Sequence, residues 1–463
     1  MARLPELPSV VPASPTKRFF VSMLTRDIAL EDALLDLLDN CIDGILRTRK
    51  PASSEKAPYS GSWAHLTLSP DQFVIEDNCG GIPLKIARTS AFMMGRPTGA
   101  PGEGLPTVGV YGIGMKRAIF KLGRDCVVSS YASDAKFEVR ISKAWFGEES
   151  NWELPLGPLK RAFPHPGTKI HVTDLNDEVK AKFSPDDPFI ENFRKAVAQH
   201  YNRILQKGFV VTVNRVAIKP TILRFLSIPD LRESGIAPYL FHGRVNEVDV
   251  DVIAGFYRPS PGEDELEEET ETSRSSDEAG WTVMCNDRVV LAQDKTILTG
   301  WGEAGVPRYH NQFIGIAGIV HFRSKEPAKL PLTTTKRGID ASSPVFLQVK
   351  NKMRDGLKRF TSMTNRFKKD PVERARLFAA TKDYTVDELD ALRGTATFST
   401  DRSVANAKVF LPRLPDLKKG TGKTIKFTRP EKQIKKVAQK LFDDPDVSPN
   451  IVGEACFDRV LHE

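Results

Sequence analysis

Three polar side chains that could contact a cation lie above one another on a single predicted helix. In the stretch ALLDLLDNCIDGIL, Asp36, Asn40 and Asp43 recur at i, i+4 and i+7, so they share one helical face. Like charges at this spacing repel by roughly 0.2–0.5 kcal/mol per pair, and Arg47 is the first basic residue beside them. The face is therefore either solvated or a metal site, and we expect a counter-charge from outside the helix.

A strand that ends in an acidic residue and glycines offers a second polar site. The segment FVIEDNCGGIP predicts a strand that ends at Asp77, with Gly81 shortly after it. Glycine lets the backbone approach a ligand closely, and Asp77 is placed to accept a hydrogen bond there. Thr168 follows a glycine at the start of another strand, PGTKIHVTDL. Taken alone, such segments are more often turns.

A glycine-rich turn that leads into a helix is the third feature. In VGVYGIGMKRAIFKLG, Gly109, Gly112 and Gly114 precede a helix, and Lys116 lies near its start. The free N–H groups and the positive dipole end of a helix N-terminus suit an anion such as phosphate. The Gly/Pro-rich loop before it is too long for a simple connection, so we expect a functional segment there.

The elements that must position these residues indicate an α+β fold. The apolar residues of the first helix recur every three or four positions, which is typical of an amphipathic helix packed on a core. AHLTLSPDQFVIEDN predicts a hairpin with its turn at residues 69–71, and further strands follow at CVVSSYA, KFEVRIS and GTKIHVTDL. We expect residues 1–198 to form an antiparallel sheet with helices on one face, which is a two-layer α/β sandwich.

Two further regions are expected. Residues 199–367 predict a smaller α/β domain with strands at FVVTVNRVAIK, EVDVDVIAGFYRP, GWTVMCNDRVVLA and GIAGIVHFRS, and with an exposed acidic insertion at about 262–280. Residues 368–463 are expected to be mainly helical and basic. Between residues 351 and 440 there are 23 Lys and Arg against 10 Asp and Glu. This excess indicates either a solvated surface or a contact with nucleic acid or an acidic partner.

Composition narrows the class of protein. The chain has 463 residues, of which 40% are hydrophobic and 27% charged, and its formal net charge is +8; these are ordinary values for a globular protein. No apolar run approaches the ~18 residues of a membrane helix, and the Pro-rich N-terminus is unlike a signal or transit peptide. The five scattered cysteines lack zinc-site spacing and favour a reducing compartment. We expect a cytoplasmic protein, with the nucleus as the alternative location if it is eukaryotic, and no membrane partner.

The order of these motifs resembles that of the GHKL ATPases, the superfamily of gyrase B, the ninety-kilodalton heat-shock chaperones, histidine kinases, MutL and MORC proteins. DLLDNCIDG, IEDNCGGIP, GVYGIGMKRA and GTKI look like its four nucleotide-binding boxes, over about residues 20–200. The second region resembles the transducer domain of gyrase, MutL and MORC, whose lysine-bearing loop is matched by LPLTTTKRGI. The resemblance is greatest to MORC-like members. It implies a Bergerat-type ATP-binding fold, then a β-α transducer domain and a helical C-terminal region.

The resemblance also implies a role for each motif residue. Asn40 would hold Mg²⁺, and Asp36 would act as the general base one helical turn earlier. Asp77 would accept a hydrogen bond from the adenine amino group, with Thr168 beside it, and Gly81 would let the base pack closely. Two other acidic residues of the helix are interpreted as solvated or turn-capping and are left out of the site, namely Asp39 and Asp43.

The phosphates would be bound by the glycine-rich turn and by the transducer loop. A lid over about residues 95–116 would wrap them through Gly109, Gly112, Gly114 and Lys116. Lys336 would stabilise charge on the transferring phosphoryl group. The magnesium ion would then supply the counter-charge that the acidic helix lacks.

The activity that the resemblance implies is Mg-dependent ATP hydrolysis. ATP would close the lid, dimerise the N-terminal domains and drive a conformational change that acts on DNA or a protein client through the basic C-terminal region. Two alternatives are a nucleotide-gated binding or scaffold module with little turnover, and a DNA-binding clamp. The family's base is usually Glu, and Asp36 is one methylene shorter. Since a displacement of ~1 Å can reduce a rate on the order of a hundredfold, we expect slow turnover.

Overall fold

The computed structural model describes residues 16–52, 55–95, 104–109, 112–149, 151–160, 163–262, 278–333, 335–368, 370–415, 425 and 428–462. Part of the expected lid (residues 96–103, 110 and 111) and most of the acidic insertion (263–277) lie outside them. The chain divides into two compact units, Met1–Pro415 and Asp416–Glu463. The fold class is α+β with mixed sheets, as the sequence predicts in its broad form. The expected domain boundaries at residues 198 and 367 stay predictions.

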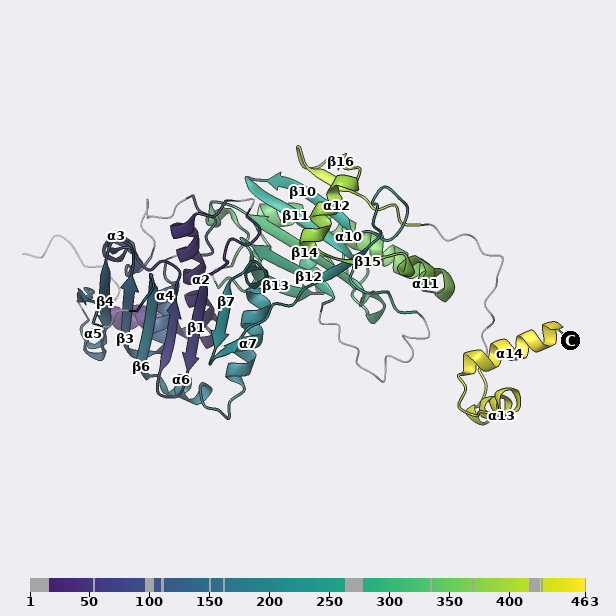
Figure 1. The fold of residues 1–463 in the computed structure, drawn as a ribbon, viewed down its shortest axis with the longest axis horizontal. Helices are drawn as coiled ribbons and strands as arrows, with labels where there is room; N and C mark the ends of the chain where they lie inside the picture. Colours follow the sequence, from purple (N-terminus) through teal and green to yellow (C-terminus); the bar gives the residue numbers. More distant parts are fainter. Residues whose placement is uncertain are drawn as a thin grey trace, which may run out of the picture. The chain divides into compact units, whose positions relative to one another are not determined.

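The first sheet of the described structure has eight strands in the order β5-β4-β3-β6-β2-β1-β7-β8 (Figure 1). They are β1 (Trp63–Leu68), β2 (Phe73–Asp77), β3 (Gly123–Tyr131), β4 (Lys136–Ile141), β5 (Leu156–Pro158), β6 (Gly167–Leu175), β7 (Val210–Val213) and β8 (Val216–Ala217). The predicted β1–β2 hairpin is confirmed. The prediction that β7 belongs to the second region is wrong, because β7 pairs in parallel with β1 and buries Val211 and Val213 in the first core.

Helices pack on one face of this sheet (Figure 1). They are α1 (Lys17–Arg26), α2 (Leu30–Arg49), α3 (Leu84–Ile86) with a π-helical turn at Ala87–Ala91, α4 (Gly114–Leu122), α5 (Lys143–Gly147), α6 (Asp177–Lys182), α7 (Phe189–His200) and α8 (Asn202–Gln206). Along β1, Ala64 and Leu66 are buried whereas His65 and Thr67 are exposed. Because successive strand residues face opposite sides, this alternation leaves the other face of the sheet to solvent. The predicted amphipathic helix at residues 33–46 is confirmed as α2.

The second sheet of the described structure has the order β13-β12-β14-β11-β10-β17-β16. Its strands are β10 (Tyr239–Val245), β11 (Val248–Phe256), β12 (Gly280–Cys285), β13 (Arg288–Asp294), β14 (Ile316–Arg323), β16 (Ser399–Thr400) and β17 (Lys408–Phe410), and a separate pair is formed by β9 (Arg224–Ser227) and β15 (Lys382–Thr385). The long helix α10 (Pro344–Phe367) packs against β10, β11 and β14. The mainly helical region expected from residue 368 thus also contributes strands, because buried residues of β17 extend the second sheet.

The remaining helices are short. In the first unit these are α11 (Pro371–Ala379) and α12 (Val386–Leu392), and the described part of the second unit consists of α13 (Glu431–Phe442) and α14 (Pro449–His462). Each helix that the structure describes is too short or too polar to traverse a lipid bilayer. The cysteines are all free thiols, as their spacing predicts.

Candidate functional site

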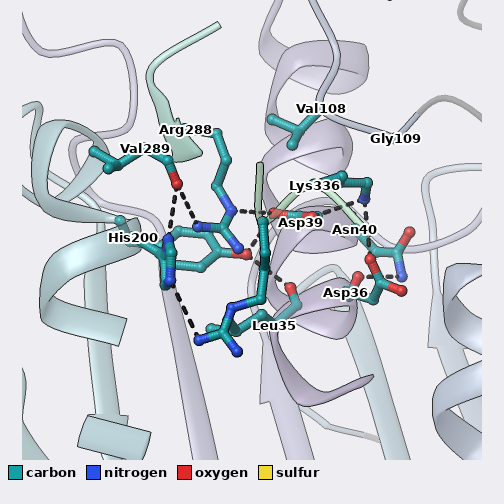
Figure 2. Close-up of polar contacts among 12 residues, drawn as sticks. Leu35, Asp36, Asp39, Asn40, Val108, Gly109, His200, Arg288, Val289 and Lys336 are labelled. Carbon is teal, nitrogen blue, oxygen red and sulfur yellow. Dashed lines mark hydrogen bonds and ion pairs between the residues drawn. The ribbon is translucent and has the colours of Figure 1, made fainter. Parts of the chain in front are cut away.

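Asp36 and Asp39 of α2 are buried acids whose partners are protein cations. The Lys336 ammonium bridges them, since Nζ lies 3.1 Å from Asp36 Oδ1 and 2.7 Å from Asp39 Oδ2 (Figure 2). Arg117 Nη2 lies 2.5 Å from the other oxygen of Asp36, and Arg288 Nε lies 3.1 Å from Asp39 Oδ1. Three cations from other elements therefore neutralise this part of the acidic face.

This pairing corrects two expectations. Asp39 is neither solvated nor a turn cap, because it is only 1% exposed. A magnesium ion is also not needed as the missing counter-charge, since α4, β13 and the Lys336 loop supply cations to the helix. Buried carboxylates require such partners. The prediction of Mg²⁺ now rests on Asn40 and on the motif order, not on charge balance.

Asp43 holds the glycine-rich segment against α2. Its carboxylate oxygens accept hydrogen bonds from the backbone N–H groups of Val108, at 2.8 Å, and Gly109, at 2.9 Å. Burial raises the pKa of Asp43, and the two N–H groups only partly oppose that shift. The interpretation of Asp43 as solvated or as a cap on a neighbouring turn is therefore wrong, because it fixes a segment distant in the sequence.

Asn40 is the exposed polar residue of this helix face. Its side-chain Nδ2 donates to the carbonyl oxygen of Asp36 at 2.9 Å, and the residue is exposed. This hydrogen bond leaves the amide oxygen available for a ligand. Mg²⁺ takes few protein oxygens and keeps several waters, so the residues present fit a magnesium ion held through Asn40. Among the described residues, no group of three or more His, Cys, Asp or Glu side chains is arranged to hold a metal.

Asp77 ends β2 in a buried environment, and its hydrogen-bond donors are neutral. Its Oδ1 accepts hydrogen bonds from the backbone N–H of Cys79, at 2.7 Å, and of Thr168, at 3.3 Å, and Cys41 Sγ lies 3.6 Å from Oδ2. Burial outweighs these bonds and raises the pKa of Asp77 to about 6. The carboxylate is therefore ionised at neutral pH and able to accept a further hydrogen bond from a ligand.

Gly81 occupies a position near Asp77 in the sequence where any side chain would clash with the backbone of Tyr131. Its φ is +71°, and a Cβ atom there would lie 2.2 Å from the carbonyl oxygen of Tyr131. Only glycine fits this position without movement of the backbone.

Lys116 is turned toward backbone carbonyls. It is 2% exposed, and its Nζ donates to the carbonyl oxygens of Ala91, at 2.9 Å, and of Gly112. Burial lowers the pKa of Lys116 to about 8. The side chain thus joins the segment that precedes the expected lid to the C-terminal part of the lid, and its contact with phosphate stays a prediction.

Lys336 lies at the tip of a tight loop. The loop is closed by a bridge between Leu332 and Ile339, and Lys336 itself adopts a φ of +57°. Burial alone would lower the pKa of Lys336, but the carboxylates of Asp39 and Asp36 outweigh it and raise that pKa. The ammonium therefore stays charged at any physiological pH.

One cavity of about 210 Å³ collects all of the candidate site residues. Those on its wall are Asp36, Asn40, Asp77, Gly81, Gly109, Gly112, Gly114, Lys116, Thr168 and Lys336. Small-molecule sites usually exceed ~300 Å³. A nucleoside triphosphate would therefore extend beyond this volume toward the open side of the cavity.

Sequence reasoning missed three residues of this site. Arg117, Tyr201 and Arg288 contact the acids of α2. Arg117 lies within the box GVYGIGMKRA but has no expected role there, and the other two lie outside the motifs. For Arg288 there is a signal, because it begins the otherwise apolar strand segment RVVLA. A charged residue at such a position usually has a buried partner.

Comparisons with known proteins do not assign the chain to a class. No protein-family profile matches it. No curated protein matches its sequence.

Proposed function

We propose that the chain is an ATPase of the GHKL type that binds Mg–ATP in this cavity and hydrolyses it slowly. The observation that carries the proposal is that motif residues from widely separated segments line one cavity. Lys336 is the strongest case, because it lies 300 residues from Asp36 in the sequence and still contacts it. The proposal includes a Bergerat-type ATP-binding fold followed by a transducer domain. It is supported by the first sheet, which is covered by helices on one face, and by the second sheet that follows it in the chain.

The base would bind at Asp77. Its ionised carboxylate accepts from the exocyclic amino group of adenine, and Thr168 lies beside it on the same wall. Gly81 leaves room for the ring. Asn40 is the protein ligand for magnesium, and the bound ion would orient and neutralise the phosphate oxygens.

The terminal phosphate would lie against Asp36 and Lys336. Asp36 orients the attacking water, and Lys336 donates to the phosphoryl oxygens as their charge develops. Arg117 holds the Asp36 carboxylate from its other side. Closure around the nucleotide would couple to homodimerisation and to a DNA or protein client, for which exposed lysines of α13 such as Lys432 and Lys436 offer a surface.

A nucleotide-gated binding module is the second candidate function. Both carboxylate oxygens of Asp36 are paired with cations, Lys336 on one and Arg117 on the other. A carboxylate held in this way is poorly placed to take a proton from water. In this module ATP binding would shift a conformational equilibrium without appreciable turnover.

Phosphate release from radiolabelled ATP separates the two candidates. Asp36→Asn and Lys336→Ala should reduce release at least about 100-fold, the order expected for a lost charge-stabilising contact, while binding of a non-hydrolysable analogue persists. Lys352→Ala is the matched control, because Lys352 forms an equally buried pair with Asp401 and does not line the cavity. This control should leave the rate unchanged. If wild-type release does not exceed the background without protein while the analogue still binds, hydrolysis is excluded and the binding module stands.

A further inference from the structure

Asp39 lies behind Lys336 as viewed from the cavity. Lys336 and Asp36 line the cavity, whereas Asp39 does not. The Lys336 ammonium is nevertheless closer to Asp39, at 2.7 Å, than to Asp36, at 3.1 Å. Figure 2 shows Asp39 between Arg288 and Lys336. The principal anchor of the ammonium is therefore a residue that a cavity ligand would not touch.

The Asp39 carboxylate is itself held in one orientation. Its Oδ1 accepts from Arg288 Nε at 3.1 Å and from the Tyr201 hydroxyl at 2.5 Å. The Arg288 guanidinium lies 4.5 Å from the centre of the Tyr201 ring, so these two donors also contact each other. Because both bond the same oxygen, the other oxygen, Oδ2, faces Lys336.

The ammonium retains one donor for a ligand. A lysine ammonium has three N–H groups, and those of Lys336 bond Asp36 and Asp39. Within the described ranges no residue accepts the third. Since Lys336 lies on the cavity wall, this N–H group is available to an anion there.

We propose that Asp39, oriented by Arg288 and Tyr201, is the positioning residue for Lys336 and holds its ammonium at the cavity wall for the terminal phosphate of a nucleotide. This inference rests on the proposed function for the identity of the anion. The contact between Asp39 and Lys336 does not depend on the identity of the anion. Asp39 touches no reacting atom, and acts through Lys336 alone.

The nucleotide-free protein offers a direct test, because acetic anhydride acetylates only neutral amines. In Asp39→Asn, loss of the adjacent charge should lower the pKa of Lys336. Its acetylation rate, followed by mass spectrometry, should then rise at least about tenfold, since one neighbouring charge moves a pKa by 1–3 units. Asp287→Asn is the control, because Asp287 is buried and paired with Lys207 at 2.8 Å but lies off the cavity. It should leave Lys336 labelling unchanged.

Turnover provides the second readout. Asp39→Asn should lower kcat at least about tenfold and change analogue affinity by less than about threefold, because the displaced donor acts mainly on developing charge. If labelling rises but the wild type shows no turnover, the ATPase proposal fails and the positioning of Lys336 stands. Equal labelling of wild type and Asp39→Asn overturns the inference. If Asp39→Asn does not fold, Tyr201→Phe tests the same inference. We expect a smaller rise in the acetylation rate of Lys336 in this variant, and an unchanged rate would contradict the inference.

Discussion

The buried acidic residues at and behind the cavity wall differ in whether they form ion pairs. Asp36 and Asp39 form ion pairs with cations, whereas the hydrogen-bond donors to Asp77 are neutral N–H and thiol groups and the Arg47 charge acts on it without an ion pair. An ionised carboxylate in such surroundings reduces stability, and strongly perturbed groups of this kind cluster at functional sites. The pKa of about 6 therefore marks Asp77 as a candidate group for contact with a ligand.

Asp77→Asn should make the protein more stable at neutral pH. The amide oxygen can still accept from the backbone N–H groups of Cys79 and Thr168, while the buried charge is removed. One pKa unit corresponds to about 1.4 kcal/mol, so we expect the free energy of unfolding at pH 7.5 to rise by about 1–3 kcal/mol. The gain should shrink as the pH falls through about 6, because wild-type Asp77 is then protonated in the folded protein.

Urea unfolding at pH 7.5 and pH 5 measures this effect, and calorimetry of the same variant should show weakened nucleotide binding. A variant that is less stable than the wild type at pH 7.5 would contradict the electrostatic interpretation. An unchanged nucleotide affinity would remove Asp77 from the site.

At the residue scale, the sequence predicts some contacts and not others. The motif order predicts that Asp36 and Lys336 serve one site, and their polar atoms lie 3.1 Å apart. The burial of Asp39 is not predictable in this way, because its partners Tyr201 and Arg288 lie 162 and 249 residues away. Helical periodicity places Asp39 on the polar face, and only tertiary packing reveals the strand that covers it.

At the scale of elements, the helices and turns that depend on neighbouring residues in the sequence are predicted best. The periodicity of α2 and the turn between β1 and β2 depend on a few neighbouring residues, and both are predicted. The sheet to which β7 belongs depends on its pairing with β1 far away in the chain. The sequence of a short apolar strand does not indicate which strand it pairs with. The prediction that β7 belongs to the second region is wrong for this reason.

The junction of β2 and β6 places Asp77 and supplies an element-scale prediction. A Cβ atom on Gly167 would lie 1.9 Å from the carbonyl oxygen of Asp77. Gly167→Ala should therefore push the strand ends apart, destabilise the protein by about 1–3 kcal/mol and weaken nucleotide binding. Thermal unfolding and calorimetry measure the two effects. Gly157→Ala on β5 is the control, because a Cβ there meets nothing within 4 Å. Equal effects of the two substitutions would contradict the steric argument.

At the scale of the whole first unit, the two sheets are joined at the cavity. In the turn between β12 and β13, Asn286 Nδ2 donates to the carbonyl oxygen of Thr107 at 3.0 Å. Thr107 directly precedes Val108 and Gly109, whose N–H groups bond Asp43. Two residues later, Arg288 pairs with Asp39 of α2. A ligand that widens the cavity must therefore disturb contacts with the second sheet. This is the physical basis on which nucleotide binding would drive a change elsewhere in the molecule.

Calorimetric titration of the purified protein with magnesium and a non-hydrolysable ATP analogue tests the central claim most directly. The account predicts a saturable heat with one nucleotide bound per chain. It also predicts a higher melting temperature in the presence of the analogue, because a ligand that binds only the folded state stabilises it. Absence of both the heat and the thermal shift at millimolar analogue would contradict the account.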